Sequence, residues 1–277
     1  MLLRKTLPAI AAAAIALSFS ACSGSGDSTS DSTPRNNKIA FETIKGNALY
    51  RLDNTAQIYK TDTDIAYQDS ASLLMPTEIY GLNIDALKDS IIKVAFDTVT
   101  TDVEGAMDAY FKNVVAELGY QYSAGDSIAR SDWDGMTIVT GDMFNMTTRL
   151  LTYRVSNYSY SPGAAHGITI TNYITYDLER GRIMGLNDIF TPEGLAKLPA
   201  LIRARATELA PAIGPTNIEA IPSQGNFYIT LDESIVFVYQ PYEVASYAQG
   251  AIAVPFYPYQ LSELMTPEGL TFFGLNS

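Results

Sequence analysis

The sequence predicts an α+β protein in which antiparallel sheets pack with a few helices, arranged as two closely associated lobes. Three observations support this fold class. Segments rich in β-branched and aromatic residues, typical of strands, lie on both sides of a helical region. Within that region, apolar residues recur at three- and four-residue spacing. About 240 residues follow residue 37, and 47% of the chain is hydrophobic, which is enough for a substantial core in each lobe.

The first 37 residues predict a leader and a tether. Residues 1–21 combine a basic start with an apolar run that has the length of a secretory signal and is too short for a membrane span. The small residues before Cys22, the single cysteine, resemble the lipobox of bacterial lipoproteins, where the cysteine is lipidated. An ordinary secreted protein with an incidental cysteine is the alternative. Residues 22–37 are polar and predict a flexible tether. We therefore expect an extracytoplasmic protein, lipid-anchored to a bacterial membrane, either in the outer membrane or facing the periplasm.

Residues 38–150 predict an N-terminal α+β lobe. Two strand-like segments open it, 39–59 and 65–74. A helix follows with Asn83 as its predicted N-cap. Apolar residues recurring from Val103 predict a second helix, which Gly119 is expected to end as a C-cap residue.

Residues 151–277 predict a C-terminal α+β domain. An antiparallel meander is expected over 136–140, 147–158 and 169–176, with a turn at Gly181. A helix follows within 191–210. Pro199 inside it would cost about 3 kcal/mol, so the sequence favours a short turn and a new helix that begins near Pro199. The last elements predicted are a hairpin around Asp232-Glu233 and a final strand, at 227–231, 234–239 and 250–256.

A five-residue motif occurs twice in the second half of the chain. Thr191-Pro-Glu-Gly-Leu195 recurs as Thr266-Pro-Glu-Gly-Leu270, and each copy follows an apolar and acidic stretch. The sequences between the copies do not align. We therefore interpret the motif as two uses of one capped turn and not as a tandem repeat.

Composition restricts the function classes. The formal net charge of −12 argues against a nucleic-acid partner and permits a cationic one; an acidic surface that serves only solubility is the alternative. One histidine and one cysteine cannot form a zinc site of ordinary composition, and we expect no metal and no cofactor. The chain lacks the Gly-x-Ser-x-Gly elbow of many serine hydrolases.

A pair of carboxylates is the main catalytic option that remains, because glycoside hydrolysis needs only two of them. Five acids could supply such a pair: Asp132, Asp134, Asp232, Glu233 and Glu243. Chance proximity is expected among 30 acids, so the sequence leans toward a protein without catalytic residues.

Candidate binding residues lie in two segments. The first, 158–167, holds the sole histidine, His166, near Tyr160; the imidazole is either a pH-sensitive contact or a structural group that satisfies a backbone carbonyl. The second, 239–250, holds Tyr242, Glu243 and Tyr247. Tyrosine offers a large rigid contact surface with a polar tip, which suits binding, although some of these rings could equally belong to the core.

Residues 158–190 and 227–264 resemble the RsiV-type C-terminal domain. The residues that carry the resemblance are Gly163-Ala-Ala-His-Gly167, Leu186-Asn-Asp-Ile-Phe190 and Tyr239-Gln-Pro-Tyr-Glu-Val-Ala-Ser-Tyr-Ala-Gln-Gly250. This is the extracytoplasmic domain of lysozyme-sensing anti-sigma factors, also found beside polysaccharide-deacetylase domains in PdaC-like proteins. The layout of residues 38–150 is similar to the small domain that usually precedes it.

The resemblance implies an α+β fold and an envelope role in recognising lysozyme or cell-wall material. It does not imply sigma-factor control or deacetylation, because the chain contains neither of the corresponding parts. The function expected from the sequence is therefore a lipid-anchored, non-catalytic envelope protein that binds lysozyme, another cationic protein or peptidoglycan. The alternative is a carboxylate-dependent enzyme acting on envelope glycans.

Overall fold

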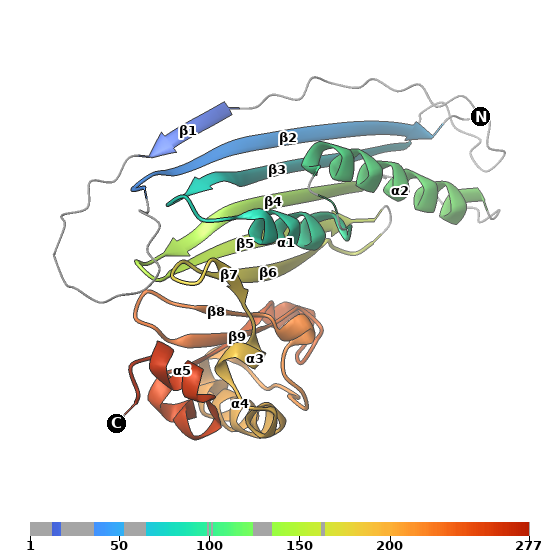
Figure 1. Cartoon of the computed structure of the whole chain (residues 1–277). Helices are drawn as coiled ribbons and strands as arrows, with labels where there is room; N and C mark the ends of the chain where they lie inside the picture. Colours follow the sequence, from blue (N-terminus) through green and yellow to red (C-terminus); the bar gives the residue numbers. More distant parts are fainter. Residues whose placement is uncertain are drawn as a thin grey trace. The chain divides into compact units, whose positions relative to one another are not determined.

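A computed structural model describes residues 13–17, 36–52, 65–98, 100, 102–123, 135–161 and 164–276. Its fold is mixed α and β, as the sequence predicts (Figure 1). Two compact units are present. Unit 1 comprises Met1–Asp142 and Val155–Thr169, and unit 2 comprises Met143–Arg154 and Ile170–Ser277. The units interleave along the chain, whereas the sequence suggested a single boundary between residues 150 and 151.

The first seven strands form one sheet in the order β1-β2-β3-β4-β5-β6-β7. Their bounds are β1 Ala13–Leu17, β2 Ile39–Leu52, β3 Ile65–Ile79, β4 Gly135–Met146, β5 Leu150–Tyr160, β6 Ile168–Asp177 and β7 Arg182–Met184. The expectation of purely antiparallel sheets is wrong at one place, because β3 and β4 pair in parallel. Two helices lie between these strands in sequence, and such a crossover is the usual connection between parallel neighbours.

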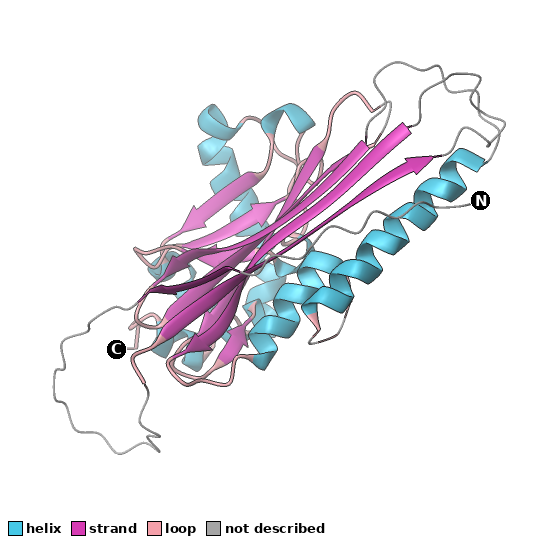
Figure 2. Cartoon of the chain, turned by 90° about the horizontal axis from the view of Figure 1, so that it is seen from above, coloured by secondary structure: helices cyan, strands magenta, loops and turns pink. Residues whose placement is uncertain are grey.

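In unit 1, helices α1 (Asp85–Phe96) and α2 (Val103–Ser123) cover one face of strands β2 to β4 (Figures 1 and 2). Leu73 of β3 and Leu87 and Ile91 of α1 are fully buried in this layer. Helix α2 approaches β2 closely at Gly46, where an added Cβ would collide with Met107 Sδ unless that side chain shifted. The three- and four-residue apolar spacing that predicts α1 thus marked residues that the structure buries, Leu87 and Ile91.

Both helix termini in unit 1 differ from the prediction. Asn83 precedes the N-cap position, which Ile84 occupies, although its side chain still accepts a hydrogen bond from Asp85 N at 2.9 Å. Gly119 does not end α2, which runs on to Ser123. Glycine costs a helix only about 1 kcal/mol relative to alanine, which the rest of a helix of 21 residues can offset.

Unit 2 contains a three-stranded antiparallel sheet in the order β10-β9-β8, packed with helices. Its elements are α3 Leu186–Ile189, α4 Pro192–Ile213, η1 Ser223–Gly225, β8 Phe227–Ile229, β9 Ile235–Tyr239, η2 Tyr247–Gln249, β10 Ile252–Phe256, η3 Pro258–Leu264 and α5 Pro267–Phe272. All five residues of β9 are buried. The hairpin predicted around Asp232-Glu233 and the last strand are confirmed.

The expectation that a helix begins near Pro199 is wrong. Helix α4 begins at Pro192, after the N-cap Thr191, whose hydroxyl accepts a hydrogen bond from Gly194 N at 2.9 Å. Pro199 lies inside the helix, and the buried stripe that includes Leu198 and Ile202 continues past it. Burial of this apolar face outweighs the local cost of the proline, because tertiary packing supplies most of the stability of a helix in a protein.

The two Thr-Pro-Glu-Gly motifs begin helices α4 and α5 and pair with each other. Each threonine hydroxyl accepts a hydrogen bond at 2.9 Å from the glycine N three residues on. The backbone N of Thr191 donates to Leu264 O at 3.0 Å, and the backbone N of Thr266 donates to Ile189 O at 2.9 Å. An antiparallel bridge joins the intervening residues Phe190 and Met265. We call this reciprocal pair of capped turns the double turn.

Most of the predicted leader and tether, including Cys22, lies outside the described residues. Strand β1, which pairs with β2, is the described part of the predicted leader. Among the helices that the structure describes, none is both long and apolar enough to span a membrane.

Candidate functional site

The segment between β9 and β10, residues 240–251, forms a loop whose conformation is fixed by its own side chains. Glu243 makes three of these contacts. Its Oε1 accepts from Ser223 N at 2.7 Å and from Ser223 Oγ at 2.8 Å, and its Oε2 accepts from Gln240 N at 2.7 Å. Both carboxylate oxygens are therefore engaged within the chain. The structure gives Glu243, a predicted binding residue, the role of holding this loop.

Gln249 holds the other end of the loop. Its Nε2 donates to Ile213 O at 2.8 Å and to Pro215 O at 2.9 Å, at the end of α4. Its Oε1 accepts from Ser246 Oγ at 3.1 Å. The loop is thus attached at both ends to residues far away in sequence, so its shape is set before any ligand arrives.

This loop carries a stacked pair of tyrosines, of which Tyr242 is exposed and Tyr247 is half-buried. The rings of Tyr242 and Tyr247 lie 5.4 Å apart with 29° between their planes, and 59% of the Tyr242 surface is exposed. The backbone φ of Tyr242 is +70°, in the left-handed region that residues other than glycine seldom adopt. Such strain persists only where the surrounding contacts impose it, and it is concentrated at functional sites. Of the predicted binding residues in unit 2, Tyr242 and Tyr247 therefore present aromatic surface, and Glu243 orients them.

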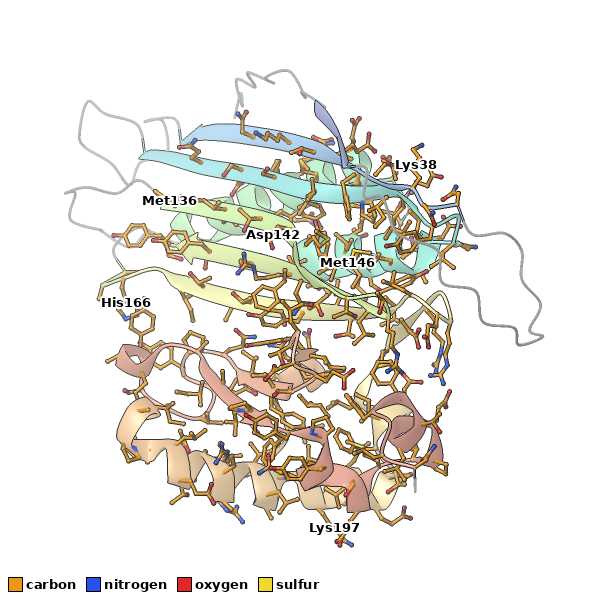
Figure 3. The ribbon with its side chains drawn as sticks, turned by 90° about the vertical axis from the view of Figure 1, so that its left-hand side faces the viewer. Lys38, Met136, Asp142, Met146, His166 and Lys197 are labelled. Carbon is orange, nitrogen blue, oxygen red and sulfur yellow. The ribbon has the colours of Figure 1, made fainter. Side chains whose placement is uncertain are left out.

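The other two predicted residues, Tyr160 and His166, belong to unit 1. Tyr160 is the last residue of β5 and is half-buried. His166 is exposed in the turn that precedes β6 (Figure 3), and its Nδ1 lies 3.1 Å from Gly167 O. Gly167 lies directly against the ring of Tyr158, with which an added Cβ would collide unless the ring shifted.

Further tyrosines divide between core and surface. Tyr239 is 1% exposed and donates its hydroxyl to Ala220 O at 2.7 Å; burial raises the pKa of this phenol. Tyr257 and Tyr259 form a second exposed stack, with ring centroids 5.8 Å apart and 8° between their planes. They follow β10, whereas Tyr242 and Tyr247 precede it.

Of the acids considered for catalysis, Asp232 and Glu233 lie in an exposed turn, and Glu243 accepts hydrogen bonds from Ser223 and Gln240. Asp232 lies in the exposed hairpin turn, where hydrogen bonds from the Thr230 and Ser234 hydroxyls lower its pKa. Glu233 is exposed in the same turn with a φ of +64°. Asp132 and Asp134 lie outside the described residues. Within the described ranges, no cluster of three or more His, Cys, Asp or Glu side chains could hold a metal ion.

Two amide side chains that sequence reasoning missed connect β6 to the three-stranded sheet of unit 2. Gln240 donates through Nε2 to Thr171 O at 2.7 Å and accepts from Thr171 N at 3.0 Å. Asn226, which is buried, donates to Thr171 O and Val238 O and accepts from Tyr173 N. These side chains make the hydrogen bonds to the β6 backbone that a neighbouring strand would otherwise make. A polar residue buried at this position could not be distinguished in the sequence from an ordinary loop asparagine.

Comparison with known proteins identifies a domain type and a fold. A family model described as "Protein of unknown function (DUF3298)" matches residues 187–257. A DUF3298 family member from Bacteroides fragilis NCTC 9343 has a similar crystal structure, with a TM-score of 0.62 and 20% identity over 85% of this chain and 96% of that one. A DUF3298 family protein from Pseudomonas aeruginosa PAO1 gives a TM-score of 0.53 and 13% identity over 82% of this chain and 94% of that one. No curated protein matches the sequence.

Proposed function

We propose that this chain is a lipid-anchored extracytoplasmic protein of the bacterial cell envelope that binds lysozyme, another cationic protein or peptidoglycan without catalysing a reaction. The observation that carries the proposal is the exposed Tyr242, which stacks on Tyr247 at a strained backbone position. Glu243 and Gln249 fix the loop beneath it through their hydrogen bonds. A rigid aromatic contact loses little conformational entropy on binding, and preorganisation of this kind increases affinity.

Charge and resemblance support the same proposal. A net charge of −12 attracts cationic proteins and speeds their association at low salt. The DUF3298 match over residues 187–257 overlaps the residues that resemble the RsiV-type C-terminal domain. We extend that resemblance to the proposed recognition of lysozyme or cell-wall material.

Binding assays on the full chain in non-ionic detergent test the proposal. Hen lysozyme is immobilised for one assay, and isolated peptidoglycan sacculi are co-sedimented with the chain in the other. We expect Tyr242→Ala to weaken retention by about tenfold or more, because an exposed anchor of this kind behaves as a hot spot. Tyr259→Ala is the matched control, since Tyr259 is 64% exposed in another stack. Retention by neither material at low salt, or equal retention of Tyr242→Ala and the native chain, would refute the proposal.

A further inference from the structure

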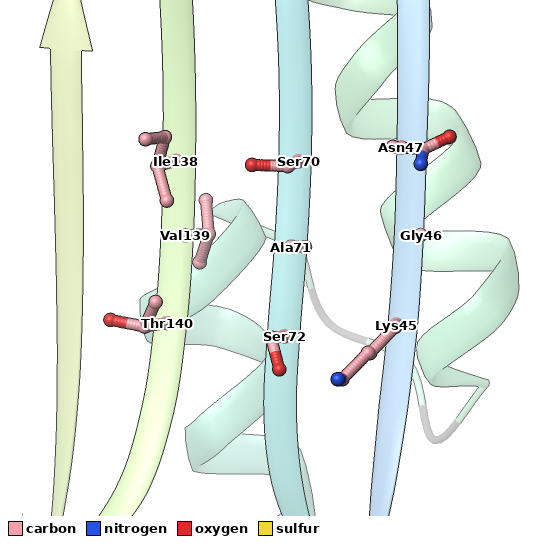
Figure 4. A pocket seen from close by; sticks show the side chains of 9 residues that line it. All are labelled: Lys45, Gly46, Asn47, Ser70, Ala71, Ser72, Ile138, Val139 and Thr140. Atoms are coloured by element: carbon pink, nitrogen blue, oxygen red, sulfur yellow. The ribbon is translucent and has the colours of Figure 1, made fainter. Parts of the chain in front are cut away.

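Unit 1 carries a hollow of about 350 Å³ on the sheet face opposite α1 and α2 (Figure 4). Strands β2, β3 and β4 form its base, and residues 45–47, 70–72 and 138–140 line it. Its volume is at the lower end of the roughly 300–1,000 Å³ found for small-molecule sites. The loop of residues 240–251 in unit 2, which we call the tyrosine loop, contributes no residue to it.

The strand registers explain the shape of the hollow. Lys45 pairs with Ser72, and Asn47 pairs with Ser70, across β2 and β3. On the other side of β3, Ser70 pairs with Ile138 and Ser72 with Thr140. Because alternate residues of a strand face the same way, these six side chains share one face. The short serines form a floor along β3, and the longer side chains of β2 and β4 form two walls. We call this hollow the serine trough.

The lining of the serine trough has a definite chemistry. Its six outward side chains carry three hydroxyls, one amide, one aliphatic group and one ammonium, Gly46, Ala71 and Val139 complete the lining, and none is acidic or aromatic. Lys45 is exposed, and no carboxylate among the described residues pairs with its ammonium. In Figure 4 the Lys45 side chain leans toward Ser72 across the trough. Ile138, with 38% of its surface exposed, presents an apolar patch on the opposite wall.

These groups exclude several kinds of ligand. A peptide cannot add as a strand here, because β3 already pairs with β2 and β4 on its two edges. A nucleobase would find no ring on which to stack, and one ammonium is a weak match for a polyphosphate. The lining instead suits a small ligand with hydroxyl and amide groups, one carboxylate and a methyl group.

We propose that the serine trough binds a carboxylate-bearing N-acetylated sugar, a second binding site independent of the tyrosine loop. Lys45 pairs with the carboxylate, and the hydroxyls of Ser70 and Ser72 exchange hydrogen bonds with ring hydroxyls. Ile138 contacts the acetyl methyl group. The choice of a cell-wall sugar as the source rests on the proposed envelope function, whereas the chemistry of the site rests on its lining.

Isothermal titration of the full chain in detergent tests this proposal with two probes. The first is the disaccharide of N-acetylglucosamine and N-acetylmuramic acid, which carries one carboxylate, and the second is neutral diacetylchitobiose. We expect the carboxylated probe to bind about tenfold more tightly, and Lys45→Gln to abolish this preference. Ser72→Leu should remove binding of both probes by filling the floor. Lys93→Gln is the control for charge, since Lys93 is an exposed lysine on α1 of the same unit.

The outcomes separate the two proposals. Binding of the carboxylated probe that is lost in Lys45→Gln and kept in Lys93→Gln and Tyr242→Ala supports the trough, whatever happens with lysozyme or sacculi. No heat with either probe at millimolar concentration overturns it, as does equal binding by the native chain and Lys45→Gln. Tighter, Lys45-dependent binding of a blocked Ser-Glu-Ser peptide would also overturn it, because the ligand would then be an acidic peptide.

Discussion

Replacing Gly194 by alanine should open the double turn. A Cβ at Gly194 would lie well under 3.0 Å from Leu264 O, a distance that real Cβ atoms essentially never show. The carbonyl group cannot simply rotate away, because it accepts the hydrogen bond from Thr191 N. The two turns must therefore separate by about 1 Å to restore an ordinary contact, which sacrifices much of the dispersion energy between them.

The contacts of Gly194 set the expected size of the destabilisation. Forced overpacking costs about 1–3 kcal/mol, and loss of the two backbone hydrogen bonds between the turns adds about 1 kcal/mol each. The higher helix propensity of alanine offsets up to about 1 kcal/mol of this loss. The free energy of unfolding should therefore fall by about 2–4 kcal/mol.

Urea unfolding followed by circular dichroism measures this change. We expect the midpoint to fall by about 1 M with the slope unchanged. Gly269→Ala should have a similar effect, because its Cβ would collide with Ile189 O in the same way. The double variant should cost less than the sum of the two, since one collision already separates the turns. Gly185→Ala is the control, because its Cβ would lie 3.7 Å from Asp188 Oδ2 at an ordinary φ of −105°. Gly194→Ala with native or higher stability would refute the reasoning.

Two further predictions concern Asp69 and Cys22. Asp69 is fully buried in β3; burial raises its pKa to about 7 from 3.8, against a smaller lowering by the Thr137 hydroxyl. The folded state therefore binds this proton more tightly than the unfolded state. The free energy of unfolding should fall by up to about 4 kcal/mol as pH rises from about 4 to about 7, and Asp69→Asn should remove most of that fall; identical pH profiles of the two chains would contradict this. Cys22→Ser should move the chain from the membrane to the soluble fraction of its host cells; an unchanged membrane fraction would argue against lipidation.

Sequence patterns predicted most of the secondary structure because strands, helices and helix caps depend largely on interactions between residues close in sequence. Alternating and helical apolar spacing located the strands and helices, and the threonine and proline of the repeated motif marked real helix starts. The sequence misplaced the start of α4 because the cost of Pro199 is visible locally, whereas the burial of Ile202 that offsets it is not. The parallel pairing of β3 with β4 and the contact between the two turns depend on long-range arrangement, which no single pattern reports.

The candidate site was predicted only in part for the same reason. Tyrosines in a polar segment indicated an aromatic surface, and the structure exposes Tyr242 as that interpretation required. The hydrogen bonds of Glu243 to Ser223 could not be predicted, because they join residues 20 positions apart through a loop. The serine trough was missed because its six side chains come from three strands, and only the register brings them together.

The interleaving of the two units constrains the order in which the chain can fold during synthesis. Unit 1 lacks its last segment until Thr169 has been made, and by then the first segment of unit 2, Met143–Arg154, has already been made. In many proteins an N-terminal domain completes its fold before the next domain is translated. This chain therefore cannot fold in that order. Both units must therefore remain incompletely folded at the same time. A fragment ending at residue 150 would contain neither unit in full.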